Sequence, residues 1–559
     1  MRGRVYLLAA VGGFLFCAWA ATPPTNAIFF EDVAAQSGIH AQMRCGGPEK
    51  KWIPEANGSG AAWLDFDRDG RMDLLIVNGS TMDDLRQIVA GRVPPAREGS
   101  LYLYRNLGNG HFEEVAAHAG LANPYWGTGA AVADFDNDGY PDILVTNIGV
   151  DLLFHNNRDG TFTEVGRQAG LRRKVAWHTG AAFGDYDGDG RLDLYVAGYV
   201  DLSALRLDAP PPVCIYRGIP GFCGPVGLKG EADILYHNDG HAGFSDVTTK
   251  AGVRDKSLRH GFTVVFDDFN QDGKIDIFVA NDSDPNYLYV NRGDGTFEET
   301  GLPSGVAFGG DGRTQSNMGV AVGDYNNDGL LDLLTTTFSE DYFPLFRQQP
   351  HFLFEEISAN AGIVAVTTPW VGWACGFADF DNDGQRDLWM ANGHVYPKAG
   401  MLASTSYLQP VAVLANRGGK FVKAFELTGN LPNSYRGGAA GDFNNDGRID
   451  LVVLPVAGSP LMLENRTQSS SHWIGLDLRG RAGNRDAIGA HVRVQACGGT
   501  QVEVVRNGGS YLSVDDPRLH FGLGSCGTLE RLRIRWPAGR VQILENIAVD
   551  RYLTVEEPL

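Results

Sequence analysis

Beyond its first twenty residues, the sequence lacks any apolar run long enough to cross a membrane. It also lacks three common catalytic signatures: H-E-x-x-H, G-x-S-x-G and the phosphate-binding G-x-x-x-x-G-K-[ST]. One G-x-G-x-x-G stretch, Gly522–Gly527, precedes a strand-like segment rather than a helix, which argues against dinucleotide binding. The histidines are scattered along the chain. Because no catalytic constellation is found, we predict that the protein is not an enzyme.

Positive charge is scarce relative to negative charge. The chain has 47 lysines and arginines against 67 aspartates and glutamates, which gives a formal net charge of −20 and a pI near 5.0. Such a surface repels nucleic acids and anionic membranes, so neither is expected as a partner. Cations are the natural counterpart of this chain.

The N-terminus has the pattern of a secretory signal peptide at residues 1–20. Arg2 and Arg4 precede an apolar run, and Ala18 and Ala20 supply small residues at a cleavage site. A retained membrane anchor is the alternative, although the run is shorter than the ~20 residues that a spanning helix needs. We therefore expect an exported protein, secreted or located in the periplasm or at the cell surface, with no transmembrane span after signal removal.

Cysteine is also rare, with six residues left after the predicted cleavage. An even number in an exported protein favours disulfides. Cys214 and Cys223 share one Pro/Gly-rich loop, and Cys497 and Cys526 share the C-terminal segment, so these are the local pairings. Cys45 and Cys375 are the remainder. The sequence contains no C-x-x-C pair, so a metal site built from these cysteines is not expected.

Internal repeats are the strongest signal in the chain. Seven segments fit D-[FY]-[DN]-x-D-G-x-x-D, beginning at Asp65, Asp134, Asp185, Asp268, Asp324, Asp379 and Asp442. Each follows a stretch of small residues and precedes an apolar run, so each loop joins two buried strands. An L-[YF]-x-N strand and a G-x-F-x-[ED]-V strand recur between the loops. Four strands per unit predict an all-β, seven-bladed β-propeller.

The ends of the repeat array predict how the ring closes. Phe30–Val33 is an F-x-[ED]-V strand that comes before any acidic loop, and the last unit ends at Leu461–Asn465 without one. The two pieces together complete one blade, which removes exposed strand edges. We place the propeller at residues 28–467 and a β-rich domain, a sandwich or partly open barrel of about eight strands, at 472–559.

The acidic loops have the residues of a calcium site. Carboxylates at positions 1, 3 and 5 turn inward together, position 7 offers its carbonyl, position 9 a further aspartate, and glycine at position 6 permits the turn. An EF-hand is excluded because position 12 is Ile76 or Val145, within a strand. Four loops carry four aspartates, and three have asparagine at position 3. Without cations these carboxylates would repel one another, so we predict up to seven Ca²⁺ ions.

The predicted ligands are those at positions 1, 3, 5, 7 and 9 of each loop. They are Asp65, Asp67, Asp69, Arg71 and Asp73; Asp134, Asp136, Asp138, Tyr140 and Asp142; Asp185, Asp187, Asp189, Arg191 and Asp193; Asp268, Asn270, Asp272, Lys274 and Asp276; Asp324, Asn326, Asp328, Leu330 and Asp332; Asp379, Asp381, Asp383, Gln385 and Asp387; and Asp442, Asn444, Asp446, Arg448 and Asp450.

These loops resemble the FG-GAP or VCBS repeats of integrin α-subunit propellers. The stretches CIYRGIPGFCGPVG from Cys214, NRDAIG from Asn484, LHFGLG from Leu519 and RWPAG from Arg535 resemble the cartilage-acidic-protein-like family, which has a C-terminal ASPIC/UnbV domain. The resemblance implies calcium in hairpins on one face of the propeller and ligands on the other. The fifth unit departs from the pattern, since Leu345–Arg347 and Phe352–Phe354 replace the usual return strands, so we expect an irregular blade.

The function predicted from these features is an exported calcium-binding recognition, adhesion or scaffold protein with structural calcium. Its partner is expected to be an extracellular or envelope protein or glycan. A calcium-dependent polysaccharide lyase or other carbohydrate-active propeller is the alternative. Candidate ligand-contacting positions, for which plain turn chemistry is the other interpretation, are Asn78, Asn147, Asn281–Asn286, Asn392–Tyr396 and the insert Asp201–Lys229.

Overall fold

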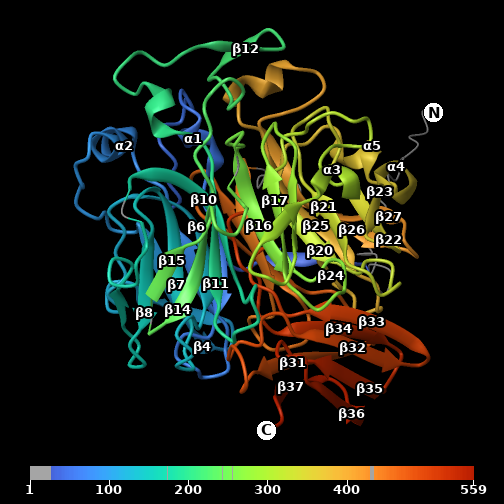
Figure 1. Cartoon of the computed structure of the whole chain (residues 1–559). Coiled ribbons are helices and arrows are strands. Elements are labelled where there is room, and N and C mark those ends of the chain that lie inside the picture. The colour runs from blue at the N-terminus through green and yellow to red at the C-terminus, as the bar shows by residue number, and fades with distance from the viewer. Residues whose placement is uncertain (1–26, 173, 242, 255, 428–432) are drawn as a thin grey trace, which may run out of the picture.

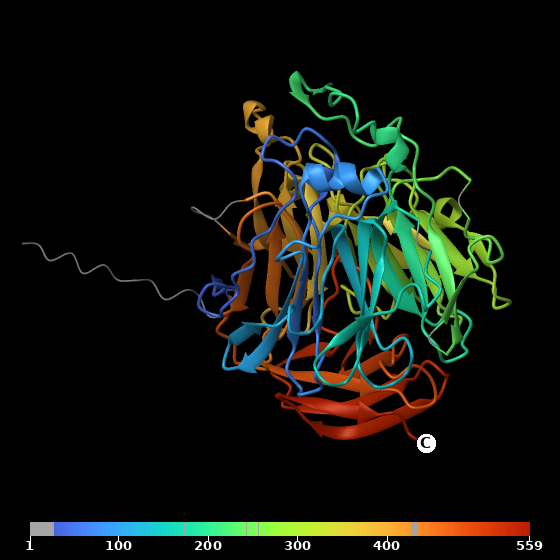
Figure 2. The same ribbon diagram turned by 90° about the vertical axis from the view of Figure 1, so that its left-hand side faces the viewer.

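The computed structural model of the chain describes residues 27–172, 174–241, 243–254, 256–427 and 433–559. The predicted signal peptide lies outside the described residues. Antiparallel four-stranded blades surround a central axis, and the C-terminal strands lie against one end of the ring (Figures 1 and 2). The predicted seven-bladed propeller is confirmed. Among the described residues, no helix is both long and apolar enough to span a bilayer.

Each blade has four strands, and the acidic loop joins its innermost strand to the second. The blades consist of β2 (Ala61–Leu64), β3 (Asp73–Val77), β4 (Leu101–Gly108) and β5 (His111–Glu114); β6 (Trp126–Ala133), β7 (Asp142–Gly149), β8 (Leu152–Asn156) and β9 (Phe162–Glu164); β10 (Ala176–Gly184), β11 (Asp193–Gly198), β14 (Ile234–Gly240) and β15 (Gly243–Asp246); β16 (Gly261–Asp267), β17 (Asp276–Asn281), β18 (Tyr287–Asn291) and β19 (Phe297–Glu299); β20 (Val320–Gly323), β21 (Asp332–Thr335), β22 (Leu345–Gln349) and β23 (Leu353–Glu356); β24 (Gly372–Ala378), β25 (Asp387–Gly393), β26 (Leu408–Asn416) and β27 (Phe421–Glu426); and β28 (Tyr435–Gly441), β29 (Asp450–Pro455), β30 (Leu461–Asn465) and β1 (Phe30–Asp32).

Short helices occupy the connections between strands. They are α1 (Pro54–Asn57), α2 (Met82–Val89), α3 (Gly301–Ser304), α4 (Ser358–Ala361), α5 (Val364–Thr367) and the 3₁₀ turns η1 (Leu202–Leu205) and η2 (Pro397–Met401). The insert of the third blade adds a two-stranded hairpin, β12 (Cys214–Tyr216) and β13 (Ile219–Gly221). This hairpin stands at the end of the ring away from the C-terminal strands (Figure 1).

The innermost strands are rich in glycine and alanine because they converge on the axis. A Cβ atom at Gly180 would lie 2.2 Å from the carbonyl oxygen of Phe262 in the next blade, and one at Gly319 would lie 2.0 Å from that of Trp373. Larger side chains would force neighbouring blades apart. The small-residue stretches in the sequence are therefore a requirement of the ring.

The seventh blade closes the ring as predicted. β1 pairs antiparallel with β30, with Phe30 opposite Asn465 and Asp32 opposite Leu463. The N–H of Val33 donates to the Met462 carbonyl at 2.8 Å, which extends the pairing by one residue. The outermost strand of the last blade is thus the first strand of the described chain.

The C-terminal strands form two sheets, as expected for a sandwich. One contains β34 (Leu519–Gly524), β31 (His472–Arg479) and β37 (Arg551–Glu556); the other contains β33 (Gly499–Val504), β32 (His491–Ala496), β35 (Thr528–Arg535) and β36 (Val541–Ala548). Trp536 is fully buried in the core between them. We refer to residues 472–559 as the C-terminal domain.

The loop between β33 and β34 enters the axis of the propeller, a feature that the sequence did not indicate. The N–H of Val514 donates to the Ala61 carbonyl at 2.8 Å, and the N–H of Ser510 donates to the Val320 carbonyl at 2.7 Å. These carbonyls belong to the first and fifth blades, on different sides of the axis. We call residues 506–516 the axial loop.

The tip of the axial loop is Tyr511, which is fully buried. Its ring packs edge-on against Phe262 and Trp373, with ring centroids 5.4 and 4.9 Å away, and its hydroxyl donates to the Asn57 carbonyl at 3.1 Å. Side chains from the fourth and sixth blades and backbone near the first therefore meet on one residue of the C-terminal domain. The loop fills the axis and fastens the two parts of the chain together.

Two disulfides, Cys214–Cys223 and Cys497–Cys526, are present as predicted from their proximity in sequence. The remaining pair, Cys45 and Cys375, is not a disulfide: both are free and buried. Cys375 lies on β24, whereas the thiol of Cys45 contacts the Pro54 carbonyl oxygen at 3.3 Å. Each thiol is held by its own local packing.

The expected irregularity of the fifth blade is wrong. β20 to β23 pair in the same order as in the other blades and without a register shift. The departure is confined to the turn, where His351 and Phe352 adopt φ of 68° and 59°. Gln348 takes the position that asparagine holds in the other blades, and its side-chain NH₂ likewise donates to the adjoining blade, at the Phe269 carbonyl.

Candidate metal centres

The first aspartate of each acidic loop shapes the turn. Asp65 Oδ1 accepts from the N–H of Asp69 at 2.9 Å, and Oδ2 accepts from that of Gly70 at 3.0 Å. The glycine has φ of 84°, a conformation that disfavours other residues. The second, third, fifth, sixth and seventh loops repeat both bonds. The sequence motif thus encodes a backbone shape that gathers carboxylates.

The ninth residue ties the loop to the third strand of its blade. Asp73 is fully buried; its Oδ2 accepts from the N–H of Phe66 at 3.1 Å, and its Oδ1 accepts from that of Asn106 at 2.7 Å. Corresponding bonds from the third strand reach the ninth aspartate of every other loop. The carboxyl group of the ninth residue therefore lies beneath each loop, between the second and third strands of the blade.

The asparagine of the L-[YF]-x-N signature links neighbouring blades. Its side-chain NH₂ donates to the carbonyl of the loop's second residue in the adjoining blade, at 2.8 Å for Asn106 and Phe443. That bond joins the first blade to the seventh. The same contact recurs around the ring and joins Asn156 to Phe66, Asn238 to Phe135, Asn291 to Tyr186, Gln348 to Phe269, Asn416 to Tyr325 and Asn465 to Phe380.

Burial makes the ninth-position carboxylates hard to ionise without a cation. Loss of hydration, together with nearby carboxylates, raises the pKa of Asp73 to about 8, that of Asp142 to about 9 and that of Asp276 to about 8, although backbone hydrogen bonds oppose the shift. Burial likewise raises the pKa of Asp193, Asp387 and Asp450 well above the usual range. These sites need either protons or a bound cation.

Several loop oxygens are buried and make no hydrogen bond within the protein. They are Asp67 Oδ1, Asp268 Oδ1, Asp276 Oδ2, Asp332 Oδ2 and Asp381 Oδ1, all at ligand positions 1, 3 or 9. An unpartnered buried oxygen is costly, and a cation bound in the loop would satisfy it. In the first three loops, oxygens of positions 1, 3 and 9 lie within 4.8 Å of one another. The residues fit a hard divalent cation.

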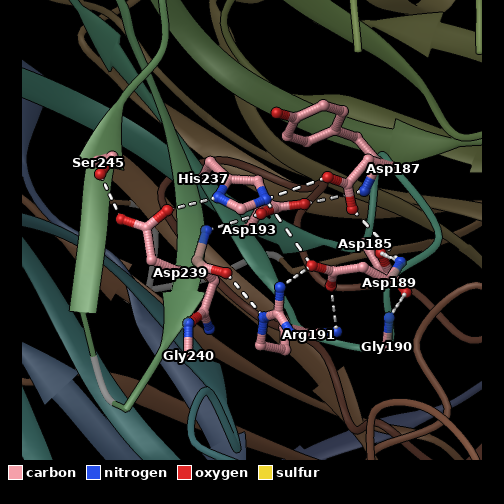
Figure 3. A network of polar contacts seen from close by, with 12 residues as sticks. Asp185, Asp187, Asp189, Gly190, Arg191, Asp193, His237, Asp239, Gly240 and Ser245 are labelled. Carbon is pink, nitrogen blue, oxygen red and sulfur yellow. Dashed lines mark hydrogen bonds and ion pairs between the residues drawn. The ribbon is translucent and has the colours of Figure 1, made fainter. Parts of the chain in front are cut away.

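The third loop adds a residue that the sequence analysis did not single out (Figure 3). His237 Nε2 lies 3.1 Å from Asp187 Oδ2 and 3.7 Å from Asp189 Oδ2. His237 stands just before the linking asparagine on β14, and the equivalent residue in the second blade, His155, lies 2.9 Å from Asp136. The sequence signal that could have indicated these histidines is the residue x of L-[YF]-x-N, because its side chain faces the acidic loop of the same blade.

The C-terminal domain lies directly on the acidic loops. Arg535 Nη2 donates to Asp268 Oδ2 at 2.9 Å, and the Tyr552 hydroxyl donates to Asp442 Oδ2 at 2.8 Å. Arg506 pairs with buried Asp267, next to the fourth loop, at 3.1 Å. This end of the propeller is therefore occupied by the chain itself.

Most of the residues predicted to contact a ligand are buried, so the prediction is wrong for them. Asn78 is fully buried and donates to the Gln42 and Gly99 carbonyls at 2.9 and 2.8 Å, which is turn chemistry. The same burial applies to Asn147, Asn281, Asn286, Asn392 and His394. Burial lowers the pKa of His394 to about 3. The insert Asp201–Lys229 is different, since Val213, Ile215 and Val226 are exposed.

Comparison with known families agrees with this architecture. Residues 83–145, 134–196 and 268–335 match the FG-GAP-like repeat, and residues 480–559 match the family described as ASPIC and UnbV. The chain is an FG-GAP-repeat protein with a C-terminal ASPIC/UnbV domain. The resemblance derived from the sequence is confirmed.

Relatives of this FG-GAP-repeat protein extend over most of the chain. Cartilage acidic protein 1 of Mus musculus is 26% identical over 534 residues, which is 89% of this chain and 73% of the mouse protein. The Homo sapiens protein is 26% identical over 457 residues, which is 77% of this chain and 63% of the human protein.

Solved structures with a similar chain course include a lectin from Agrocybe aegerita that recognises terminal N-acetylglucosamine. It is 17% identical, has a TM-score of 0.39 and covers 66% of this chain and 88% of the lectin. The rhamnogalacturonan lyase YesW is 12% identical, has a TM-score of 0.37 and covers 77% of this chain and 76% of the lyase.

The buried carboxylates predict how pH affects the metal-free protein. The folded chain keeps protons on Asp73 and Asp276 up to about pH 8, whereas the unfolded chain releases them near pH 4. Unfolding therefore releases protons in this window, so the stability of the metal-free protein should fall as pH rises from 5 to 8. Thermal melts after ion-exchange removal of metals test this. A melting temperature that rises over the same window would contradict it.

Proposed function

We propose that the protein is an exported calcium-binding recognition, adhesion or scaffold protein whose calcium ions are structural. The observation that supports this is the set of buried, unpartnered carboxylate oxygens in the acidic loops, typified by Asp67 Oδ1 and Asp276 Oδ2. Calcium accepts several oxygen ligands in flexible geometry, whereas magnesium keeps several waters. A loop that offers three or four carboxylates and a carbonyl suits calcium.

A structural role for the ions follows from what surrounds them. The ninth-position carboxylate is fixed to two strands, and the linking asparagine joins each loop to the adjoining blade. The C-terminal domain covers several loops through residues such as Arg535 and Tyr552. An ion there braces the ring and leaves little room for substrate chemistry. In this account Asp65, Asp67, Asp69 and Asp73, with the Arg71 carbonyl, hold the first ion.

An oxidising location is consistent with two disulfides, one of which fastens the hairpin β12–β13. That hairpin lies at the end of the ring opposite the C-terminal domain (Figure 1). Val213 and Ile215 are 68% and 67% exposed there, although they are apolar. The hairpin is therefore our choice for the contact with an extracellular or envelope protein or glycan. The net negative charge of the whole protein makes nucleic acid an unsuitable partner.

Calcium should govern stability. If each loop binds with a Kd near 10⁻⁴ M, millimolar calcium contributes about 1.4 kcal/mol per site, or roughly 10 kcal/mol for seven independent sites. Melting curves with calcium and after chelation measure this difference, and identical curves would refute the calcium assignment. In millimolar calcium, Asp276→Asn should lose the stabilisation that one site contributes, about 1.4 kcal/mol. Without metal it should be no less stable than the parent, because asparagine is neutral already, whereas the buried Asp276 carboxyl must take up a proton when the chain folds at neutral pH.

The matched control for Asp276→Asn is Asp294→Asn, an exposed aspartate in the same blade. It should leave both melting curves unchanged. If Asp294→Asn shifts the calcium-dependent melt as much as Asp276→Asn, the effect comes from net charge and the site assignment is wrong.

Recognition should depend on the hairpin rather than on the acidic loops. Ile215→Ser is expected to reduce retention of the folded protein on immobilised extracellular-matrix or envelope extracts, with the melting temperature unchanged because the side chain is exposed. Val422→Ser, at an exposed site on β27, is the control. Equal retention of both variants would exclude the hairpin. Calcium-dependent release of unsaturated product from an acidic polysaccharide would favour the lyase alternative instead.

A further inference from the structure

A nitrogen ligand that a calcium site does not need, His237 on β14, lies beside the third acidic loop. His237 Nε2, Asp187 Oδ2 and Asp189 Oδ2 lie within 4.8 Å of one another and converge on one point beside the loop (Figure 3). The distances from Nε2 to the two oxygens are 3.1 and 3.7 Å. Calcium and magnesium select oxygen ligands, whereas imidazole suits zinc and its neighbours among the transition metals.

The spacing of these three atoms matches a tetrahedral zinc centre. Zinc binds histidine nitrogen and carboxylate oxygen at 2.0–2.2 Å, which places tetrahedral ligands about 3.4 Å apart. The two observed distances from His237 Nε2, 3.1 and 3.7 Å, lie on either side of that value. Arg191 Nη2 also pairs with Asp189 Oδ2 (Figure 3), so an ion bound by all three atoms would replace that ion pair. A water molecule or another loop oxygen would fill the fourth position.

A second residue holds His237 in the orientation that a metal ligand needs. The Oδ1 atom of Asp239 lies 2.8 Å from His237 Nδ1, and Ser245 donates a hydrogen bond to the other oxygen of Asp239 (Figure 3). With the proton on Nδ1, the Nε2 lone pair is directed at Asp187 and Asp189. A carboxylate behind a ligating histidine is a common support in zinc sites, where it fixes the ring and raises its basicity.

Other blades provide an internal comparison at the same position. In the first blade Arg105 pairs with Asp67 at 2.7 Å, so a guanidinium takes the place of the imidazole. In the second blade His155 Nε2 lies 2.9 Å from Asp136 and 3.8 Å from Asp138. The geometry around the histidine thus occurs twice, and the third loop adds the supporting aspartate.

We propose that the third loop is a zinc-class transition-metal site with His237, Asp187 and Asp189 as ligands and Asp239 as the positioning residue. The proposal rests on the assignment of the acidic loops as metal sites, since Asp187 and Asp189 are also predicted calcium ligands. Zinc and calcium therefore compete for Asp187 and Asp189 in this loop. The second loop shares the three-ligand arrangement. It binds zinc more weakly, because the described bonds include no counterpart of the Asp239 contact.

The test is zinc binding to the full chain in millimolar calcium, after removal of metals. Equilibrium dialysis counts Zn²⁺ per chain, and Co²⁺ absorption reports tetrahedral coordination. His237→Gln should abolish the tightest site, and Asp239→Asn should weaken it about 10–100-fold with the ligands retained. His111→Gln, an exposed histidine on β5, should change nothing. Calcium-dependent melting shows that each variant is folded.

The outcomes separate this inference from the calcium proposal. Zinc binding that is unchanged in His237→Gln, or no tight zinc site in the parent, would overturn the zinc assignment while leaving calcium stabilisation intact. If calcium fails to stabilise the parent but His237-dependent zinc binding is found, the calcium proposal fails alone. Equal loss of zinc from Asp239→Asn and His111→Gln would overturn the positioning role of Asp239.

Discussion

The structure depends on buried carboxylates that must be neutralised. Each blade places its ninth-position aspartate, such as Asp73 or Asp276, between the second and third strands, where backbone N–H groups hold it and water does not reach it. These hydrogen bonds do not remove the cost of burying the charge, as the raised pKa values of Asp73 and Asp276 show. A cation in the loop would offset that cost and add a bond between strands.

Neighbouring blades share this arrangement through the linking asparagines. The side chain of Asn106 reaches the carbonyl of Phe443, so the first and seventh blades are joined at their loops as well as by β1 on β30. The C-terminal domain then fixes the ring from one end, with the axial loop on the axis and Arg535 on Asp268. The disulfide-fastened hairpin stands at the opposite end, which the C-terminal domain does not cover.

The sequence predicted features that repeat or that depend on local chemistry. Spacing and residue type determine three features, which could therefore be predicted: the seven acidic loops, the closure by Phe30–Val33 and the two disulfides. The axial loop was not, since Tyr511 meets its partners across more than a hundred residues, and no periodicity marks such contacts. Asn78 was misassigned because a turn asparagine and a ligand-binding asparagine look alike in sequence. His237 was overlooked because the motif that contains it was read for its asparagine alone.

We propose that the acidic loops hold calcium as part of the folded protein. Elemental analysis of purified full-length chain, after gel filtration in buffer with millimolar calcium followed by rapid desalting, tests this most directly. We predict several calcium ions per chain, up to seven less any loop that holds another metal, and a lower count when Asp276 and Asp332 are both changed to asparagine. If the chain retains no calcium and calcium does not change its melting temperature, the acidic loops are not calcium sites.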